Sequence, residues 1–118
     1  LIVAQRLLRK CCSGCFEAVL PQNERKVAES LDLTVSTLAG CGRGCERCGM
    51  TGYLGRTAIY EMLAVSPAVQ ETIASSAAES HVIQIAQREG FVRMGDRALG
   101  LVNNGVTTPS EVLRKIYL

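Results

Sequence analysis

Cysteines are the residues of this chain best suited to chemistry, and four of them form two pairs of the same kind. Cys12 and Cys15 enclose two residues, as do Cys45 and Cys48, and residues 16–44 separate the pairs. A C-x2-C turn brings two thiolates to one ion, and two such turns supply the tetrahedral ligand set of a structural zinc site. We therefore predict that these four cysteines bind a zinc ion that organises the fold. No position is left open for a reacting water.

The other two cysteines leave alternatives open. Cys11 could replace Cys12, because it is also within reach of Cys15 on a turn, and Cys41 could compete with Cys45 in the same way. A disulfide framework and free thiols are the alternatives to a metal. However, the cysteine content of 6 in 118 residues is below that of small secreted disulfide scaffolds. The sequence shows no export signal, and close pairs fit a metal better.

Composition excludes several classes of function. Thirteen basic and eleven acidic residues give a net charge of +2, which four thiolates around one zinc ion would bring close to zero. No basic face is implied, which argues against a nucleic acid partner. The opening Leu1-Ile2-Val3-Ala4 is too short to cross a membrane, and basic residues follow it rather than precede it as in a signal peptide. A start at Leu1 suggests a piece excised from a longer protein.

Hydrophobic periodicity predicts an α+β chain in which strands come early and helices late. Residues 1–10 read as the end of a buried strand that runs into a helical turn, 24–33 as a short helix, 34–38 as a short strand and 56–65 as a strand. From Ser66-Pro67 onward the period is helical, and four helices are expected. Their predicted starts are Ser66, a capping box at 76–79, about Met94, and a capping box at 108–111. Met50, Met62 and Met94 are expected in the core.

Glycines are dense from Gly40 to Gly55. Glycine tolerates positive φ, so this segment can wrap tightly around a metal. Glycine-rich loops also bind phosphates, but the chain contains no G-x-x-x-x-G-K-[ST] and no lysine between Lys26 and Lys115. The phosphate-loop interpretation therefore fails.

Several segments together resemble one family, the secretion-traffic ATPases. These are the hexameric motors of type II secretion and type IV pilus assembly, and the resemblance is to their C-terminal end, with its tetracysteine zinc module. The segments that carry it span most of the chain: Ala4-Gln5-Arg6-Leu7, Arg9 to Cys15, Gly44 to Cys48, Thr51 to Glu61, Arg88 to Phe91, and Gly105 to Val112. The length of residues 16–44 is closer to the secretion branch than to the pilus branch.

The chain departs from the family pattern at two positions. Cys11 stands where leucine is common, and Ala58 where glycine is common. The family's phosphate loop, acidic boxes and histidine box are missing. The resemblance therefore implies part of an ATP-hydrolysing motor, and we expect this chain alone to be inactive.

The resemblance also implies a role for Arg56, whose counterpart lies beside the adenine of the bound nucleotide. A planar guanidinium can stack on a purine, and Gly55 leaves room for it. The alternative is an ion pair between Arg56 and Glu61 or the zinc-bound thiolates. His81 is expected on a solvated helix face.

These expectations combine into one interpretation. Residues 1–10 form the edge of an ATPase core, 11–56 a tetracysteine zinc-binding module, and 57–118 a strand plus a mostly helical C-terminal subdomain. The resemblance implies zinc as a structural cofactor, with ATP and magnesium in the full-length protein. It also implies a homohexamer in the cytoplasm, peripheral to the inner membrane and bound to secretion-platform proteins. The rival hypothesis is a free-standing zinc-ribbon module that binds a protein partner.

Overall fold

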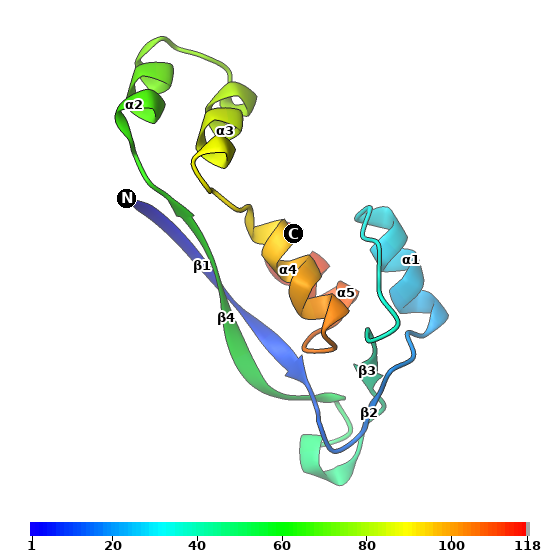
Figure 1. The fold of residues 1–118 in the computed structure, drawn as a ribbon. Helices are drawn as coiled ribbons and strands as arrows, with labels where there is room; N and C mark the ends of the chain where they lie inside the picture. Colours follow the sequence, from blue (N-terminus) through cyan, green and yellow to red (C-terminus); the bar gives the residue numbers. More distant parts are fainter. Residues whose placement is uncertain (118) are drawn as a thin grey trace.

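A long antiparallel hairpin forms the spine of the molecule (Figure 1). The structure, a computed structural model, describes residues 1–117. Strand β1 (Ile2–Cys11) pairs with β4 (Tyr53–Leu63), and the register runs from Ile2 opposite Leu63 to Arg9 opposite Arg56. A bulge between Arg9 and Cys11 ends the regular pairing. Strand and helices together confirm the α+β class.

One face of the hairpin carries the hydrophobic core. Leu8 and Ile59 lie on this inner face, and they are 0% and 3% exposed. Helix α4 (Met94–Asn103) packs on them, together with α5 (Pro109–Val112) and the π-helical turn η2 (Leu113–Tyr117). The buried cluster consists of aliphatic and methionine side chains: Leu8, Leu20, Ala39, Ile59, Met94, Ala98, Val102 and Val112. Burying such side chains is the main source of stability in a chain that has no tryptophan.

The other face of the hairpin is exposed and partly apolar. Val3, Leu7, Tyr60 and Met62 are between 43% and 51% exposed there. This corrects two expectations. Residues 1–10 were expected to be a buried strand ending in a helical turn, but they are extended throughout because their pairing with β4 continues to Arg9. Met62 was expected in the core, but the alternation of side chains along β4 places it on the exposed face of the hairpin, away from Ile59. Met50 was also expected in the core, but it lies in a loop and is 70% exposed.

A small subdomain is inserted between β1 and β4. It contains β2 (Phe16–Glu17), α1 (Gln22–Ser30), β3 (Cys41–Gly42) and the 3-10 turn η1 (Glu46–Cys48), and β2 pairs with β3. The strand expected at 34–38 is wrong. This segment is a loop tied to α4, where Ser36 N donates to Asn103 Oδ1 at 2.8 Å and Ser36 Oγ donates to Asn103 O at 2.8 Å.

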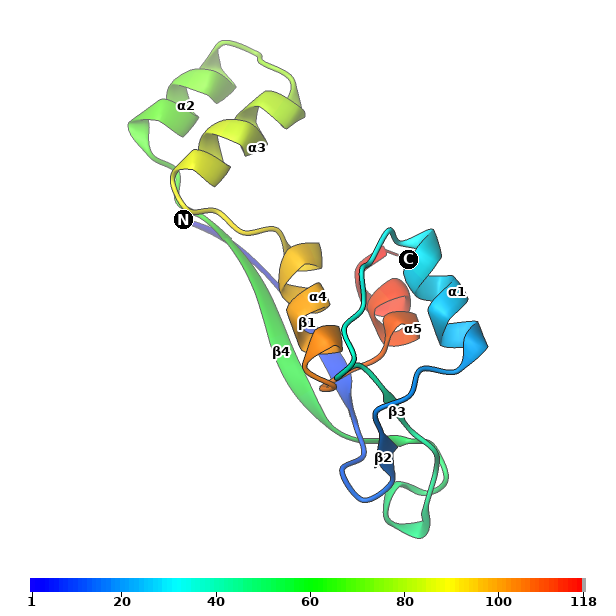
Figure 2. The ribbon, with the colours of Figure 1, turned by 45° about the vertical axis from the view of Figure 1, so that its right-hand side comes forward.

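Helices α2 (Pro67–Ala74) and α3 (Glu79–Arg88) form a pair that projects from the far end of the hairpin (Figure 2). The cap predicted at Ser66 is confirmed, since its Oγ accepts from Val69 N at 3.2 Å. The capping box predicted at 76–79 is wrong. Ser76 has φ +57 just past the end of α2, and α3 begins at Glu79 without a side-chain cap. Within residues 1–117, no helix has the length and hydropathy needed to cross a bilayer.

Candidate metal centre

The four predicted ligands meet at one point. The Sγ atoms of Cys12, Cys15, Cys45 and Cys48 all lie within 4.8 Å of one another. The closest pairs are 3.7 Å for Cys45–Cys48, 3.8 Å for Cys12–Cys45 and 3.9 Å for Cys15–Cys48. A tetrahedron with zinc–sulfur bonds of about 2.3 Å has sulfur–sulfur edges of about 3.8 Å. The cluster therefore fits a zinc ion in size as well as in chemistry.

Local backbone structure explains how each pair is presented. The first pair closes a turn in which Cys15 N donates to Cys12 O at 3.4 Å. The second pair surrounds η1, and Gly49 and Met50 follow it with φ of +63 and +64. Such left-handed residues reverse the chain directly after the last ligand.

Backbone N–H groups point at the sulfurs. Gly44 N donates to Cys15 Sγ, and the N–H groups of Cys45 and Gly52 donate to Cys48 Sγ, each at 3.3 Å. Burial opposes ionisation of Cys48, but these two donors and the neighbouring thiols outweigh it and lower the pKa of Cys48 to about 6. The pKa of Cys15 is shifted the other way: the Gly44 N–H lowers it, but burial and hydrogen bonds with the other three thiols raise it to about 12. The site therefore favours a thiolate at Cys48, and a thiolate is the form that binds a metal.

Two glycines let the strands around the site approach closely. A Cβ on Gly42 would lie 2.2 Å from Gly52 O, and a Cβ on Gly52 would lie 2.4 Å from Gly42 O. Gly52 also has φ +80. Cys12 N donates to Gly52 O at 2.9 Å, so this glycine contacts both pairs. The close approach of the backbone around the cysteine cluster therefore explains two of the glycines, Gly42 and Gly52, in the glycine-rich segment 40–55.

The two remaining cysteines lie outside the cluster. Cys11 Sγ is 3.9 Å from Gly40 O, and Cys41 Sγ is 3.9 Å from Val19 O. Burial, and then the proximity of Cys41, raise the pKa of Cys11 to about 11. The alternatives in which Cys11 or Cys41 replaces a ligand therefore have no support in the geometry.

Arg56 forms no ion pair with Glu61, one of the partners in the ion-pair alternative. Glu61 is engaged elsewhere, because its Oε2 accepts from Met94 N at 2.8 Å and so caps the start of α4. No ion pair of Arg56 is found within residues 1–117. Its side chain lines an open hollow with other basic residues.

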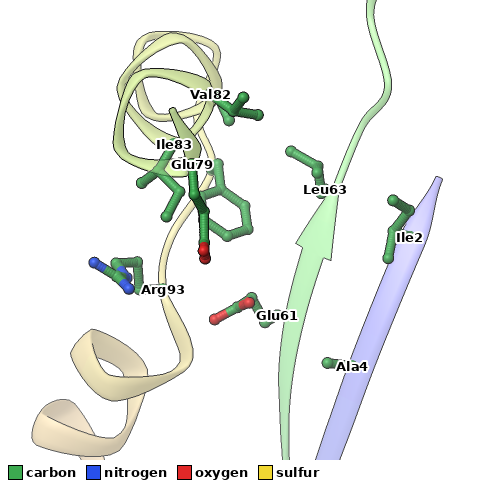
Figure 3. Close-up of a pocket in the computed structure, with 10 residues that line it drawn as sticks. Ile2, Ala4, Glu61, Leu63, Glu79, Val82, Ile83 and Arg93 are labelled. Atoms are coloured by element: carbon green, nitrogen blue, oxygen red, sulfur yellow. The ribbon is translucent and has the colours of Figure 1, made fainter. Parts of the chain in front are cut away.

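A second hollow, of about 230 Å³, lies between α3 and the hairpin (Figure 3). Glu61 and Glu79 point into it from opposite walls, and the rest of its lining is largely apolar, including Leu63, Val82 and Ile83. Because Glu61 is engaged at the start of α4, its carboxylate has a structural role there rather than an acid–base one. His81 is exposed, as expected.

Sequence reasoning missed an ion pair between a buried carboxylate, Glu111, and the partly exposed Arg9. Glu111 is 1% exposed, and its Oε2 accepts from Arg9 Nε at 2.6 Å and from Arg9 N at 3.2 Å. The sequence signal that pointed to Glu111 was the capping box predicted at 108–111, and this prediction is half correct. Thr108 Oγ1 accepts from Glu111 N at 3.3 Å, but the Glu111 carboxylate reaches β1 instead of the cap. Glu24, 8% exposed, instead accepts from another N–H of this first turn, that of Ser110, at 2.9 Å.

Known proteins have sequences similar to that of this chain. The family model described as "Type II/IV secretion system protein" matches residues 1–114. A type IV pilus assembly ATPase, PilB, of Thermus thermophilus is 35% identical over 97% of this chain and 13% of its own length. A type II secretion system protein E of Dickeya dadantii is 36% identical over 96% of this chain and 22% of its own length.

A type II secretion system ATPase E of Vibrio cholerae is 33% identical, over 96% of this chain and 22% of its own length. The chain thus spans less than a quarter of each of these relatives. The family model and the relatives cover nearly all of the chain, including both cysteine pairs. The chain therefore belongs to the type II/IV secretion system protein family.

Proposed function

We propose that this chain is the zinc-bearing part of a hexameric ATPase that powers type II protein secretion. The observation that carries the proposal is the cluster of four thiols, all within 4.8 Å of one another, in a chain of this family. Relatives named for type II secretion and for type IV pilus assembly both match. A motor for type IV pilus assembly is therefore the alternative within the same family. A free-standing zinc-ribbon module remains the rival from another class.

In this proposal zinc has a structural role only and takes no part in a reaction. Cys12 follows β1 directly, and Cys48 lies five residues before Tyr53, the first residue of β4. An ion bound to all four cysteines would connect the end of β1 to the start of β4, and it would close the inserted subdomain at its base. Binding of zinc to such a site supplies folding free energy, on the order of 10 kcal/mol or more at neutral pH.

We propose that Arg56 contacts the adenine side of the nucleotide in the full-length motor, where residues outside this chain would supply the phosphate loop and hold magnesium. Support comes from its exposed position on β4 and from the absence of an ion pair within residues 1–117. A stacking or cation–π contact of this kind contributes roughly 0.5–2 kcal/mol.

The remaining assignments follow from the same proposal. Residues 1–10 would form the edge of the ATPase core, 11–56 the zinc module, and 57–118 the strand and helical subdomain. The partners would be other subunits of a homohexamer and platform proteins of the secretion system, on the cytoplasmic side of the inner membrane. The exposed apolar face around Val3, Leu7 and Met62 supports packing against further protein.

The test uses the full-length motor and two variants. We expect Arg56→Ala to raise the KM for ATP by about 2- to 30-fold while zinc content is unchanged, which corresponds to the contact energy above. Arg88→Ala, an exposed arginine on α3, is the matched control and should leave KM unchanged. A full-length protein without ATPase activity would favour the zinc-ribbon rival, and an unchanged KM in Arg56→Ala would refute the nucleotide contact.

A further inference from the structure

The hollow beside Arg56 is basic and is built from three separate parts of the chain. It has a volume of about 610 Å³. Its lining comes from Arg9 of β1, from Thr51 just before β4, from Tyr53 and Arg56 at the start of β4, and from Arg114 and Lys115 of η2. Residues 1–10 and 113–117 are far apart in sequence, so only the fold brings these cations together. None of the lining residues is acidic.

Arg9 is held in a defined position at the wall of this hollow. Its Nε donates to the buried Glu111 carboxylate at 2.6 Å, its carbonyl accepts from Thr107 Oγ1 at 2.8 Å, and its guanidinium lies 4.1 Å from the ring centroid of Tyr53. The Tyr53 ring is itself anchored, because its hydroxyl is 2.5 Å from Thr108 Oγ1. The terminal Nη atoms of Arg9 have no hydrogen bond to residues 1–117. They remain available to an anion.

The other cations are not neutralised. Arg9 is paired with Glu111, whereas Arg56, Arg114 and Lys115 form no ion pair or side-chain hydrogen bond with residues 1–117. Arg9 and Arg56 also lie directly opposite each other in the hairpin register, where like charges destabilise the pairing. Three positive charges without an acidic neighbour create a positive potential around this concavity, which favours the binding of an anion.

We propose that this basic hollow binds the phosphate groups of a phosphate-bearing anion. Guanidinium groups match phosphate oxygens in bidentate geometry, and a lysine adds a point charge. The inference deepens the proposed nucleotide contact of Arg56, and it rests on that proposal for its choice of ligand. It assigns the phosphates to Arg9, Arg114 and Lys115, which line the hollow next to Arg56, and it keeps the proposed contact of Arg56 with the adenine side of the nucleotide.

The zinc cluster borders the same hollow. Gly52, whose N–H donates to Cys48 Sγ, directly precedes Tyr53, and Thr51 Oγ1 donates to Cys48 O at 2.7 Å. The hollow should therefore form fully only when the cluster is closed by its metal.

The test is a titration of the zinc-loaded 118-residue chain, followed by NMR amide shifts. The probes are tripolyphosphate, ATP without magnesium, adenosine, and vesicles with and without anionic phospholipid. Arg114→Gln/Lys115→Gln removes two charges from the hollow. Lys26→Gln/Arg97→Gln removes the same charge from exposed sites on α1 and α4 and is the matched control.

We expect tripolyphosphate and ATP to shift residues 51–56 and 113–117, and adenosine to have no effect. Affinity should fall at least tenfold in Arg114→Gln/Lys115→Gln and less than twofold in the control. Binding confined to anionic vesicles, with the same pattern across variants, would support the phosphate site but assign its phosphates to lipid. The phosphate site would be overturned if both double variants lost the same affinity for the phosphate probes, or if no phosphate probe bound at all.

Two further outcomes separate this inference from the nucleotide contact on which it rests. If adenosine binds and Arg56→Ala alone abolishes binding, the phosphate site is wrong and the adenine contact stands. If tripolyphosphate binds to the chain as expected but Arg56→Ala leaves the KM for ATP of the full-length motor unchanged, the phosphate site stands and the proposed nucleotide contact is wrong.

Discussion

Replacing Arg9 by methionine should destabilise the chain more than replacing its partner Glu111 by glutamine. The Glu111 side chain is 0% exposed, whereas the Arg9 side chain is 36% exposed. Without the guanidinium, a buried carboxylate keeps only the Arg9 backbone donor, and its Oε1 already has no hydrogen-bond partner. Without the carboxylate, water can still reach the guanidinium. The asymmetry in burial therefore predicts an asymmetry in cost.

The expected magnitudes follow from this difference. Removing one partner from a buried ion pair typically costs about 3–5 kcal/mol, and we expect Arg9→Met to fall in this range. Glu111→Gln should cost about 1–2 kcal/mol, because solvent screens the arginine that it leaves behind. The double variant should be more stable than Arg9→Met alone, since it no longer buries an unpaired charge.

Urea unfolding of the zinc-loaded variants, followed by circular dichroism, measures these free energies. Arg97→Met, an exposed arginine of α4, is the control and should change the free energy of unfolding by less than about 0.5 kcal/mol. If Glu111→Gln costs as much as Arg9→Met, or if the two changes are additive, the reasoning from desolvation is refuted.

Three further predictions concern the metal site and the activity of the chain. Gly52→Ala should weaken zinc affinity at least tenfold in chelator competition, because its Cβ would meet Gly42 O at 2.4 Å. Gly49→Ala shares the strain of a positive φ, here +63, but its Cβ would meet no neighbour, so its effect should be smaller. Cys11→Ser and Cys41→Ser should retain a full zinc complement by metal analysis, and a loss in either would reopen the ligand set. The isolated chain should not hydrolyse Mg-ATP or bind it with micromolar affinity; turnover above background, or a micromolar Kd by calorimetry, would contradict this.

Much of the metal centre could be predicted because it depends on short spacings. Two C-x2-C turns place their sulfurs through local geometry, and the nearby glycines mark where the backbone must approach closely. The helix caps at Ser66 and Thr108 were predictable for the same reason, since a cap uses residues three apart. What could be predicted was therefore local.

The errors arise where long-range packing decides. Met62 has the hydrophobicity of a core residue, but strand pairing turns it to the exposed face of the hairpin. The segment 34–38 has strand propensity, yet hydrogen bonds to Asn103 hold it as a loop. The pairing of Arg9 with Glu111 spans nearly the whole sequence, and no periodicity or spacing carries that information.

The central claim is that Cys12, Cys15, Cys45 and Cys48 bind one zinc ion. The most direct measurement is the metal content of protein purified without chelator, combined with X-ray absorption at the zinc edge. The account predicts one zinc per chain with four sulfur ligands at about 2.3 Å. Protein without zinc, or an absorption spectrum that requires nitrogen or oxygen ligands, would contradict it. Full zinc content in Cys12→Ser would contradict the assignment of that ligand.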